Sequence, residues 1–234
     1  QGAVVARRVG AMSTLARAEA RSPLRLLHPV FPGCRAAAVC LVTFGGGLVD
    51  RDRIDLELVV EPGATLLVFT QSTTKVFRGS AAQHLRAEVH GTLVLLPDPV
   101  ACFGGARYEQ RVDVDLRGGG ACVLLDGFTS GRAAYGERWA FDRLDLRTTI
   151  TEDGRGVLRD ALVLDGADAP VPPRLGPFEA MLTAVAFGAR AAPIARALLE
   201  PQPPSRDLVV TASPLPAGPA SGAPDPRGAI ARFA

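Results

Sequence analysis

The chain has 234 residues, 47% of them hydrophobic and 21% charged, so it is long enough for one well-packed domain or two small ones. Its 26 basic and 24 acidic side chains give a formal net charge of +2, which lacks the basic excess of a dedicated nucleic-acid-binding protein. No stretch approaches the roughly 18 apolar residues that a membrane helix needs. We therefore expect a globular protein whose partners include neither nucleic acid nor membrane.

The ends of the chain and its four cysteines bear on the cellular compartment. The chain begins with Gln1 rather than Met and shows no apolar signal-peptide core, so we expect a cytoplasmic protein that is truncated at one or both ends. The cysteines form no CxxC pair, which argues against a zinc site, and a chain this large and apolar does not need a disulfide framework. The prediction is reduced and mostly buried thiols.

Alternation of apolar and polar residues predicts β-strands along most of the chain. The clearest case is Arg53–Val60, where every second residue is aliphatic. Pro62-Gly63 follows as a turn and Ala64–Thr70 as a second strand, since Pro fixes φ and Gly accepts a positive φ at the next position. We predict a β-hairpin here.

The same pattern continues through the middle of the chain. Glycine-containing turns at Gly91, Gly118–Gly120 and Glu152–Gly154 separate further expected strands. These strands include Leu85–Val89, Thr92–Leu96, Tyr108–Val114, Ala121–Leu125 and Val157–Leu164. Turns spaced about 8–12 residues apart are typical of an all-β sandwich, a barrel or a stacked β-solenoid. No repeat of fixed period is visible. The alternation of apolar and polar residues changes phase by one residue near Asp142, which predicts a bulge or bend there.

The last third of the chain is more mixed. Two segments, 165–176 and 214–227, are rich in Pro, Gly and Ala and read as loops. Phe178–Phe187 is apolar without a clear period, so strand and helix both remain open. Ala191–Leu199 predicts a short helix. Strands are expected at Asp207–Ser213 and Gly228–Ala234.

No familiar catalytic motif is present. The sequence lacks a GxSxG elbow, a P-loop and an HExxH pair. The segment Phe44–Gly47 is rich in glycine, but an alternating strand follows it rather than the helix that a phosphate loop needs. We read Gly45, Gly46 and Gly47 as a tight turn or a place of close backbone approach.

Possible metal ligands are few. His84 and His90 fall on one face of one strand, about 20 Å apart, and so do not share an ion. Asp98, Asp126 and Glu137 lie near turns or strand ends, where carboxylates suit a divalent ion but equally form salt bridges and turn caps. Whether they converge does not follow from the sequence.

The polar loop Gln71–Ser80 carries two basic residues, Lys75 and Arg78. It is suited to binding an anion or a protein partner, or it is a turn stabilised by its Ser and Thr hydroxyls. From the residues alone, a binding or scaffold module is favoured over an enzyme. A glycosidase built on dispersed acids would require more aromatic residues than the 6% present.

Five segments together resemble the UreD (UreH) family of urease accessory proteins, especially its plant and fungal type. The family's motifs are matched in order by Gly10–Pro29, by TFGGGLVDRD (Thr43–Asp52), by TQSTTKVFR (Thr70–Arg78), by LPDPVACFGGARYEQ (Leu96–Gln110) and by SGRAAYGERWAF (Ser130–Phe141). Each motif alone is weak, but their order and spacing are specific. The resemblance thins after Leu164.

The resemblance implies a single UreD-like domain over residues 1–234. Its expected fold is mostly β, with stacked sheets in a right-handed β-helix-like arrangement and a small C-terminal helical element. It further implies a non-enzymatic scaffold without a tightly bound cofactor, which binds apo-urease together with UreF-like and UreG-like proteins while nickel is in transit. The alternative is a generic β-sheet interaction module unrelated to urease.

The resemblance also implies roles for particular residues. Asp98, Asp126 and Glu137 would contact nickel transiently, since a passage must bind an ion weakly enough to release it. Gly45, Gly46 and Gly47, with Gln71, Lys75, Arg78, Arg107 and Arg132, are candidates for a partner-facing surface or a buried polar network. Lys75 and Arg132 would pair with Asp126 or Glu137. Replacing Glu137 by Ala is expected to lower urease activation without unfolding the chain.

Overall fold

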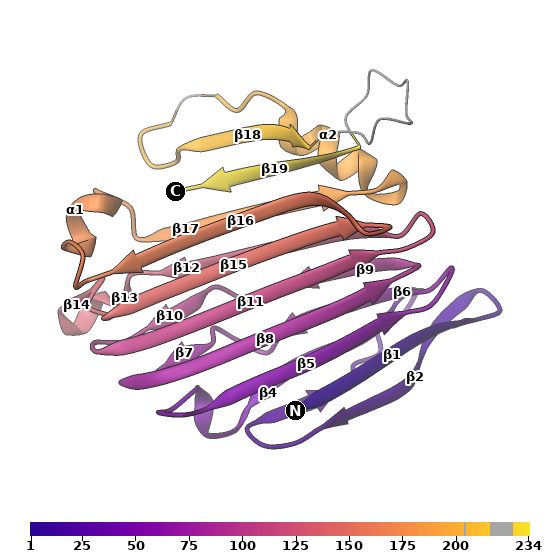
Figure 1. Cartoon of the computed structure of the whole chain (residues 1–234), viewed down its shortest axis with the longest axis horizontal. Coiled ribbons are helices and arrows are strands. Elements are labelled where there is room, and N and C mark those ends of the chain that lie inside the picture. Colours follow the sequence, from indigo (N-terminus) through magenta and orange to yellow (C-terminus); the bar gives the residue numbers. More distant parts are fainter. Residues whose placement is uncertain (204, 216–226) are drawn as a thin grey trace.

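A computed structural model describes residues 1–203, 205–215 and 227–234. Two β-sheets lie face to face and enclose the core (Figure 1). Sheet A contains, in spatial order, β16 (Arg155–Asp165), β15 (Arg143–Glu152), β11 (Ala106–Leu116), β8 (Gly79–Val89), β5 (Arg53–Val60), β1 (Gly2–Val9) and β2 (Met12–Ala20). Sheet B contains β18 (Val210–Leu215), β19 (Gly228–Phe233), β17 (Ala180–Phe187), β12 (Ala121–Thr129), β9 (Thr92–Leu96), β6 (Thr65–Thr70), β4 (Ala37–Thr43) and β3 (Leu24–Leu27).

The chain winds between the two sheets as a right-handed β-solenoid of about three turns. It passes from β4 in sheet B to β5 in sheet A, back to β6, and on through β8, β9, β11, β12 and β15. Strands of successive turns are therefore parallel neighbours within each sheet. The expected fold class of stacked sheets in a β-helix-like arrangement is confirmed.

The predicted hairpin at Pro62-Gly63 is wrong, although both of its strands are present. β5 pairs with β1 and β8, whereas β6 pairs with β4 and β9 in the opposite sheet. In the structure this turn is a corner of the solenoid. The sequence pattern does not distinguish a hairpin from a corner, because both have two half-buried strands on either side of a turn. The hairpin turn at Glu152–Gly154 does join antiparallel neighbours, β15 and β16.

The corners form two unlike edges of the solenoid. The connections from sheet A to sheet B span 61–64, 90–91 and 117–120, and we call this the tight edge. The connections from sheet B to sheet A span 44–52, 71–78, 97–105 and 130–142, and we call this the broad edge. The phase change near Asp142 is such a broad-edge corner rather than a bulge within one strand, and Trp139 there has a positive φ of 55°.

The core lies between the sheets, where the alternating pattern places it. Ile54, Leu56, Leu58 and Val60 point inward from β5 and are each at most 2% exposed. Near the C-terminus, the sequence left strand and helix open for Phe178–Phe187, and the structure has a strand there, β17. The predicted short helix is confirmed as α2 (Ala192–Leu199). This helix covers the outer face of sheet B over Ala121, Ala186 and Ala229.

The two segments predicted as loops, 165–176 and 214–227, agree only in part with the structure. Residues 165–176 contain a short helix, α1 (Val171–Leu175). Within 214–227, Pro214 and Leu215 belong to β18, and residues 216–226 lie outside the described structure. Among the described residues, no helix has the length and hydropathy to cross a membrane.

Candidate functional site

The four most specific sequence motifs meet at the broad edge. Short strands there, β7 (Lys75–Val76) and β10 (Val100–Cys102), pair in parallel with each other, and β10 also pairs with β12. Leu48 forms a parallel bridge to Val76. Segments far apart in the sequence thus lie on successive turns, one above the next.

Glycines permit this close stacking. A Cβ on Gly47 would lie 2.5 Å from the carbonyl oxygen of Lys75, and one on Gly131 would lie 2.6 Å from that of Cys102. Gly45 and Gly46 instead have positive φ angles of 72° and 75°, with open space around them. The glycine-rich segment is therefore a turn followed by a close backbone approach, as the sequence indicated.

Glu137 fastens the last of these loops to the one below it. The hairpin of β13 (Gly131–Arg132) and β14 (Glu137–Arg138) brings Arg132 onto its carboxylate, with Nε and Nη2 donating over 3.0 and 2.6 Å. The same carboxylate accepts the backbone N–H of Gly104 at 3.0 Å. The Arg132 guanidinium and this N–H lower the pKa of Glu137. Of the pairings expected for Arg132, the one with Glu137 is therefore present.

We expect Glu137→Ala to lower the melting temperature by a few degrees as well as urease activation, because it leaves Arg132 and the Gly104 N–H without their acceptor. Thermal unfolding followed by circular dichroism at pH 7 and pH 4 measures this. A carboxyl with a lowered pKa stabilises the fold above its unfolded pKa and loses that effect as the pH falls, so the variant's deficit should shrink at pH 4. Equal melting temperatures at pH 7 would contradict the fastening role.

Three of the predicted basic candidates at or beside the broad edge remain without a direct partner. Within the described residues, Lys75, Arg78 and Arg107 form no ion pair or hydrogen bond through their side chains, and Lys75 reaches neither Asp126 nor Glu137. Arg78 packs over Gly105, where a Cβ would lie 3.3 Å from it. Gln71 lines a small cavity with Thr70, Ser72, Thr73, Thr74 and Gln83.

The predicted carboxylates do not converge. Asp98 is exposed and exchanges hydrogen bonds with Thr70, whose Oγ1 donates over 2.9 Å and accepts the Asp98 N–H at 2.8 Å. Glu137 is held as described above, while Asp126 belongs to the interior. In the part of the chain that the structure describes, no group of three or more His, Cys, Asp or Glu side chains is placed to hold a metal ion.

Asp126 is joined to a polar row inside the solenoid. Gln110 is only 7% exposed, and its Nε2 donates to Asp126 Oδ1 over 2.9 Å across the gap between the sheets. The Tyr108 hydroxyl donates to Gln110 Oε1 over 3.0 Å. Gln83 is the register neighbour of Gln110 on the adjacent strand and faces the cavity beside Gln71. The row of Gln83, Gln110 and Asp126 thus crosses successive turns.

The far end of this row is a second small cavity, between the last strands of the two sheets. Asp126, Asp160, Thr148, Thr183 and Arg232 are its polar lining, and Arg232 forms an ion pair with Asp160. Burial raises the pKa of Asp126 to about 6, against the opposing effect of the hydrogen bonds from Gln110 and Gly127, and the nearby Asp160 adds a smaller increase. A carboxyl in this state exchanges its proton near neutral pH, which is unusual for aspartate.

Sequence reasoning missed most of this row. Gln110 stands in the inward phase of an otherwise apolar alternation between Tyr108 and Val112, and this irregularity was the available signal. Gln83 breaks the inward phase of β8 in the same way, between Ala81 and Leu85. Asp160 gave no signal, because it lies on a strand with charges at several positions.

The fold and the broad edge define a β-solenoid scaffold, with a packed interior, one polar row and stacked loops that carry the distinctive motifs. The family model described as "UreD urease accessory protein" matches residues 1–234, and the chain belongs to this family. It therefore has a role in urease maturation.

Relatives that match most of the chain carry corresponding names. The "Urease accessory protein UreD" of Sorangium cellulosum is 49% identical over 93% of this chain and 72% of its own length. The protein of the same name from Anaeromyxobacter is 41% identical over 92% of this chain and 75% of its own length. The "Urease accessory protein D" of Arabidopsis thaliana is 32% identical over 81% and 68%.

Proposed function

We propose that this chain is a non-enzymatic, cytoplasmic scaffold that gives nickel a path into apo-urease, in a complex with UreF-like and UreG-like proteins. The observation that carries the proposal is the polar row of Gln83, Gln110 and Asp126 through an otherwise apolar interior. Buried polar groups cost stability, so a row with a cavity at each end calls for a function.

The chemistry of the row fits an ion in transit rather than one that is retained. Amide and carboxylate oxygens are hard ligands with little selectivity among divalent ions. Asp126 is the only carboxylate within the row, and its pKa of about 6 lets it bind a cation or a proton with small changes in free energy. Two of the buried thiols, Cys102 and Cys122, would bind nickel firmly as thiolates, but burial raises their pKa values to about 12 and they stay protonated.

The outer face of sheet B supports assembly with other proteins. Its outward positions on β6, β9, β12 and β17 carry no charge and include Leu67, Val94, Leu96, Leu125 and Leu182. α2 covers one part of this face, and Phe31 packs on Phe69 over another. An uncharged strip between covered regions is typical of a protein–protein contact.

Complementation tests the proposal. Cells that carry urease and the other accessory genes but lack their own UreD would receive this chain, extended to full length where needed, and urease activity would be measured against added nickel. We expect restored activity. If the chain is folded and present, the accessory proteins are matched to it, and urease stays inactive, a generic β-sheet interaction module becomes the better description.

A further inference from the structure

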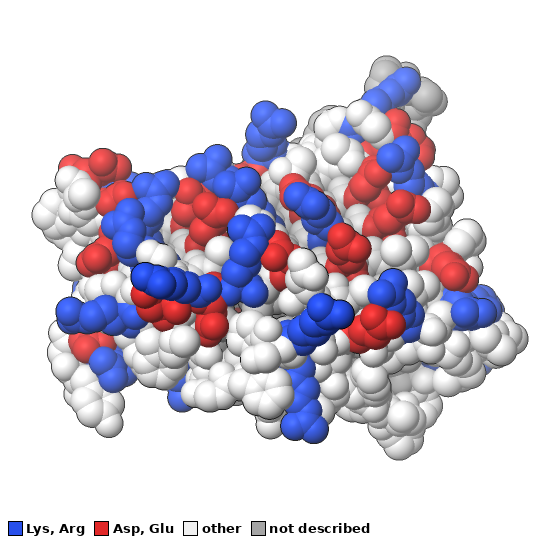
Figure 2. All heavy atoms as spheres, turned by 60° about the horizontal axis from the view of Figure 1, so that its bottom comes forward, with Lys and Arg blue, Asp and Glu red and all other residues white. Residues whose placement is uncertain are grey.

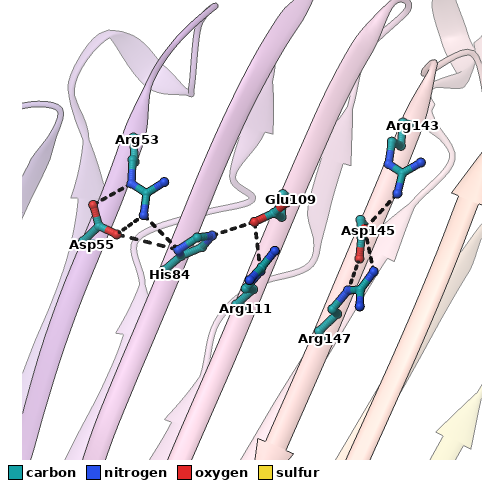
Figure 3. A network of polar contacts seen from close by, with 8 residues as sticks. All are labelled: Arg53, Asp55, His84, Glu109, Arg111, Arg143, Asp145 and Arg147. Atoms are coloured by element: carbon teal, nitrogen blue, oxygen red, sulfur yellow. Dashed lines mark hydrogen bonds and ion pairs between the residues drawn. The ribbon is translucent and has the colours of Figure 1, made fainter.

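A hollow on the outer face of sheet A lies beside the broad edge, where β5, β8, β11 and β15 begin. Its charged lining consists of Arg51, Arg53, Arg107, Arg143, Asp52 and Glu109, four arginines against two carboxylates. Figure 3 shows Arg53 and Arg143 at the same end of the sheet, with Glu109 between them. Over the face of the molecule that Figure 2 presents, basic and acidic side chains lie interleaved.

The two carboxylates of the hollow are already engaged. Glu109 accepts from His84 Nε2 at 2.8 Å and pairs with Arg111 at 2.9 Å. Asp52 accepts the backbone N–H of Val49 at 2.9 Å. Neither carboxylate forms an ion pair with an arginine of the hollow.

Two of the four arginines are also engaged. Arg53 pairs with Asp55 at 2.8 Å, and Arg143 with Asp165 at 2.6 Å. Arg107 has no hydrogen bond or ion pair within the described chain. The pKa of Asp165 is lowered chiefly by the Ala167 N–H and by Arg143, and Arg107 lies near enough to add a smaller effect. Arg51 reaches Asp50 only at 3.7 Å, and its side chain is 92% exposed.

Ser80 completes the set of free donors. It lies directly opposite Arg107 in the register of β8 and β11. Its backbone N–H donates to Asp50 and its carbonyl accepts the N–H of Arg51 at 2.7 Å, which holds Arg51 at a φ of 68°. The Ser80 hydroxyl has no partner among the described residues. Guanidinium groups and a hydroxyl converging in this way suit an oxyanion.

The opposite end of the same sheet face has the reverse charge. A second hollow toward the tight edge is lined by Arg86 against Glu57, Glu88, Asp113 and Asp115. The linings of the two hollows therefore differ in charge, with more arginines toward the broad edge and more carboxylates toward the tight edge. Such a difference orients a charged partner on approach.

We propose that the hollow at Arg107 and Ser80 receives the carboxylate of an acidic side chain on a protein with which this chain assembles. This inference rests on the proposed function. Arginines this open to solvent hold a free anion weakly, whereas a carboxylate on a partner is kept in place by the surrounding contact. Val49 and Phe44, 54% and 55% exposed on the adjoining loop, supply apolar surface for that contact.

The test compares Arg107→Glu and Arg107→Gln with Arg159→Glu, a reversal of an exposed arginine on β16, away from the hollow. Each tagged chain is captured from cells that also make apo-urease and the other accessory proteins, at 50 mM and 500 mM NaCl. We expect capture of partners to fall about tenfold for Arg107→Glu and less for Arg107→Gln at low salt, with a smaller difference at high salt. Arg159→Glu should match the parent chain.

Unchanged capture by Arg107→Glu, with its melting temperature preserved, would overturn the site alone. Failure of the parent chain to capture any of these proteins would overturn the proposed function with it. A further arm measures the melting temperature in inorganic phosphate against NaCl of equal ionic strength. Stabilisation by phosphate that Arg107→Gln abolishes, together with unchanged capture, would show a site for a free anion and would likewise overturn the proposal.

Discussion

Replacing Asp126 by Asn is expected to stabilise the fold at pH 7 while it removes most urease activation. The pKa of Asp126 is raised by burial from 3.8 to about 6, so at pH 7 the folded chain holds a charge that the unfolded chain solvates more easily. Two pKa units correspond to roughly 2–3 kcal/mol, which Asn recovers because it still accepts the hydrogen bond from Gln110. Activation should fall about tenfold or more, as when groups around a metal ion are lost.

The pH dependence separates this effect from a change in packing. Because the pKa of Asp126 is higher in the folded chain, its charge lowers the free energy of unfolding least below the pKa of the unfolded chain and most above the pKa of the folded chain. The advantage of Asp126→Asn should therefore be full above pH 6 and vanish toward pH 4. Urea unfolding at pH 4, 5, 6 and 7 measures it, with the exposed Asp98→Asn as control. A variant less stable than the parent at pH 7, or one that activates urease fully, would show that Asp126 is only structural.

Replacing Gly91 by Ala is expected to prevent stable folding. A Cβ at Gly91 would lie 2.1 Å from the carbonyl oxygen of Ala64 and 2.7 Å from that of Glu61, both on the adjacent turn. Gly120 stands in the same relation to Val89 one turn later, again at 2.1 Å. Turns of the solenoid are spaced by backbone hydrogen bonds, about 4.8 Å apart, so the clash is not relieved by moving a side chain.

We expect a loss of about 3 kcal/mol or more in the free energy of unfolding for Gly91→Ala, within the range of the most disruptive substitutions. Gly156→Ala is the matched control, because nothing lies within 4 Å of its Cβ position and its φ is ordinary. Denaturant unfolding or the yield of folded protein measures both. If Gly91→Ala unfolded at the same denaturant concentration as Gly156→Ala, the tight edge would be looser than the structure shows.

The sequence by itself determined where the strands lie and which family the chain belongs to. The predicted bounds agree with the structure to the residue for the strands Arg53–Val60 and Thr92–Leu96. This is possible because alternation with a period of two and glycine or proline turns are local properties. The motifs were equally local, and their order along the chain was enough for the resemblance. The glycine-rich segment was also understood correctly, since the strand after it excluded a phosphate loop.

Only the tertiary structure decided how the strands pair and what their side chains do. β5 and β6 lie in different sheets, because an alternating pattern fixes which face is buried but not which strand is the neighbour. Glu137 meets Gly104 only because loops of successive turns stack, while its pairing with Arg132 arises within one hairpin. The pKa of Asp126 depends on Gln110 and on the depth of burial, and both are set by strands from other turns of the solenoid. Such environments arise from contacts between distant segments, which local sequence patterns do not encode.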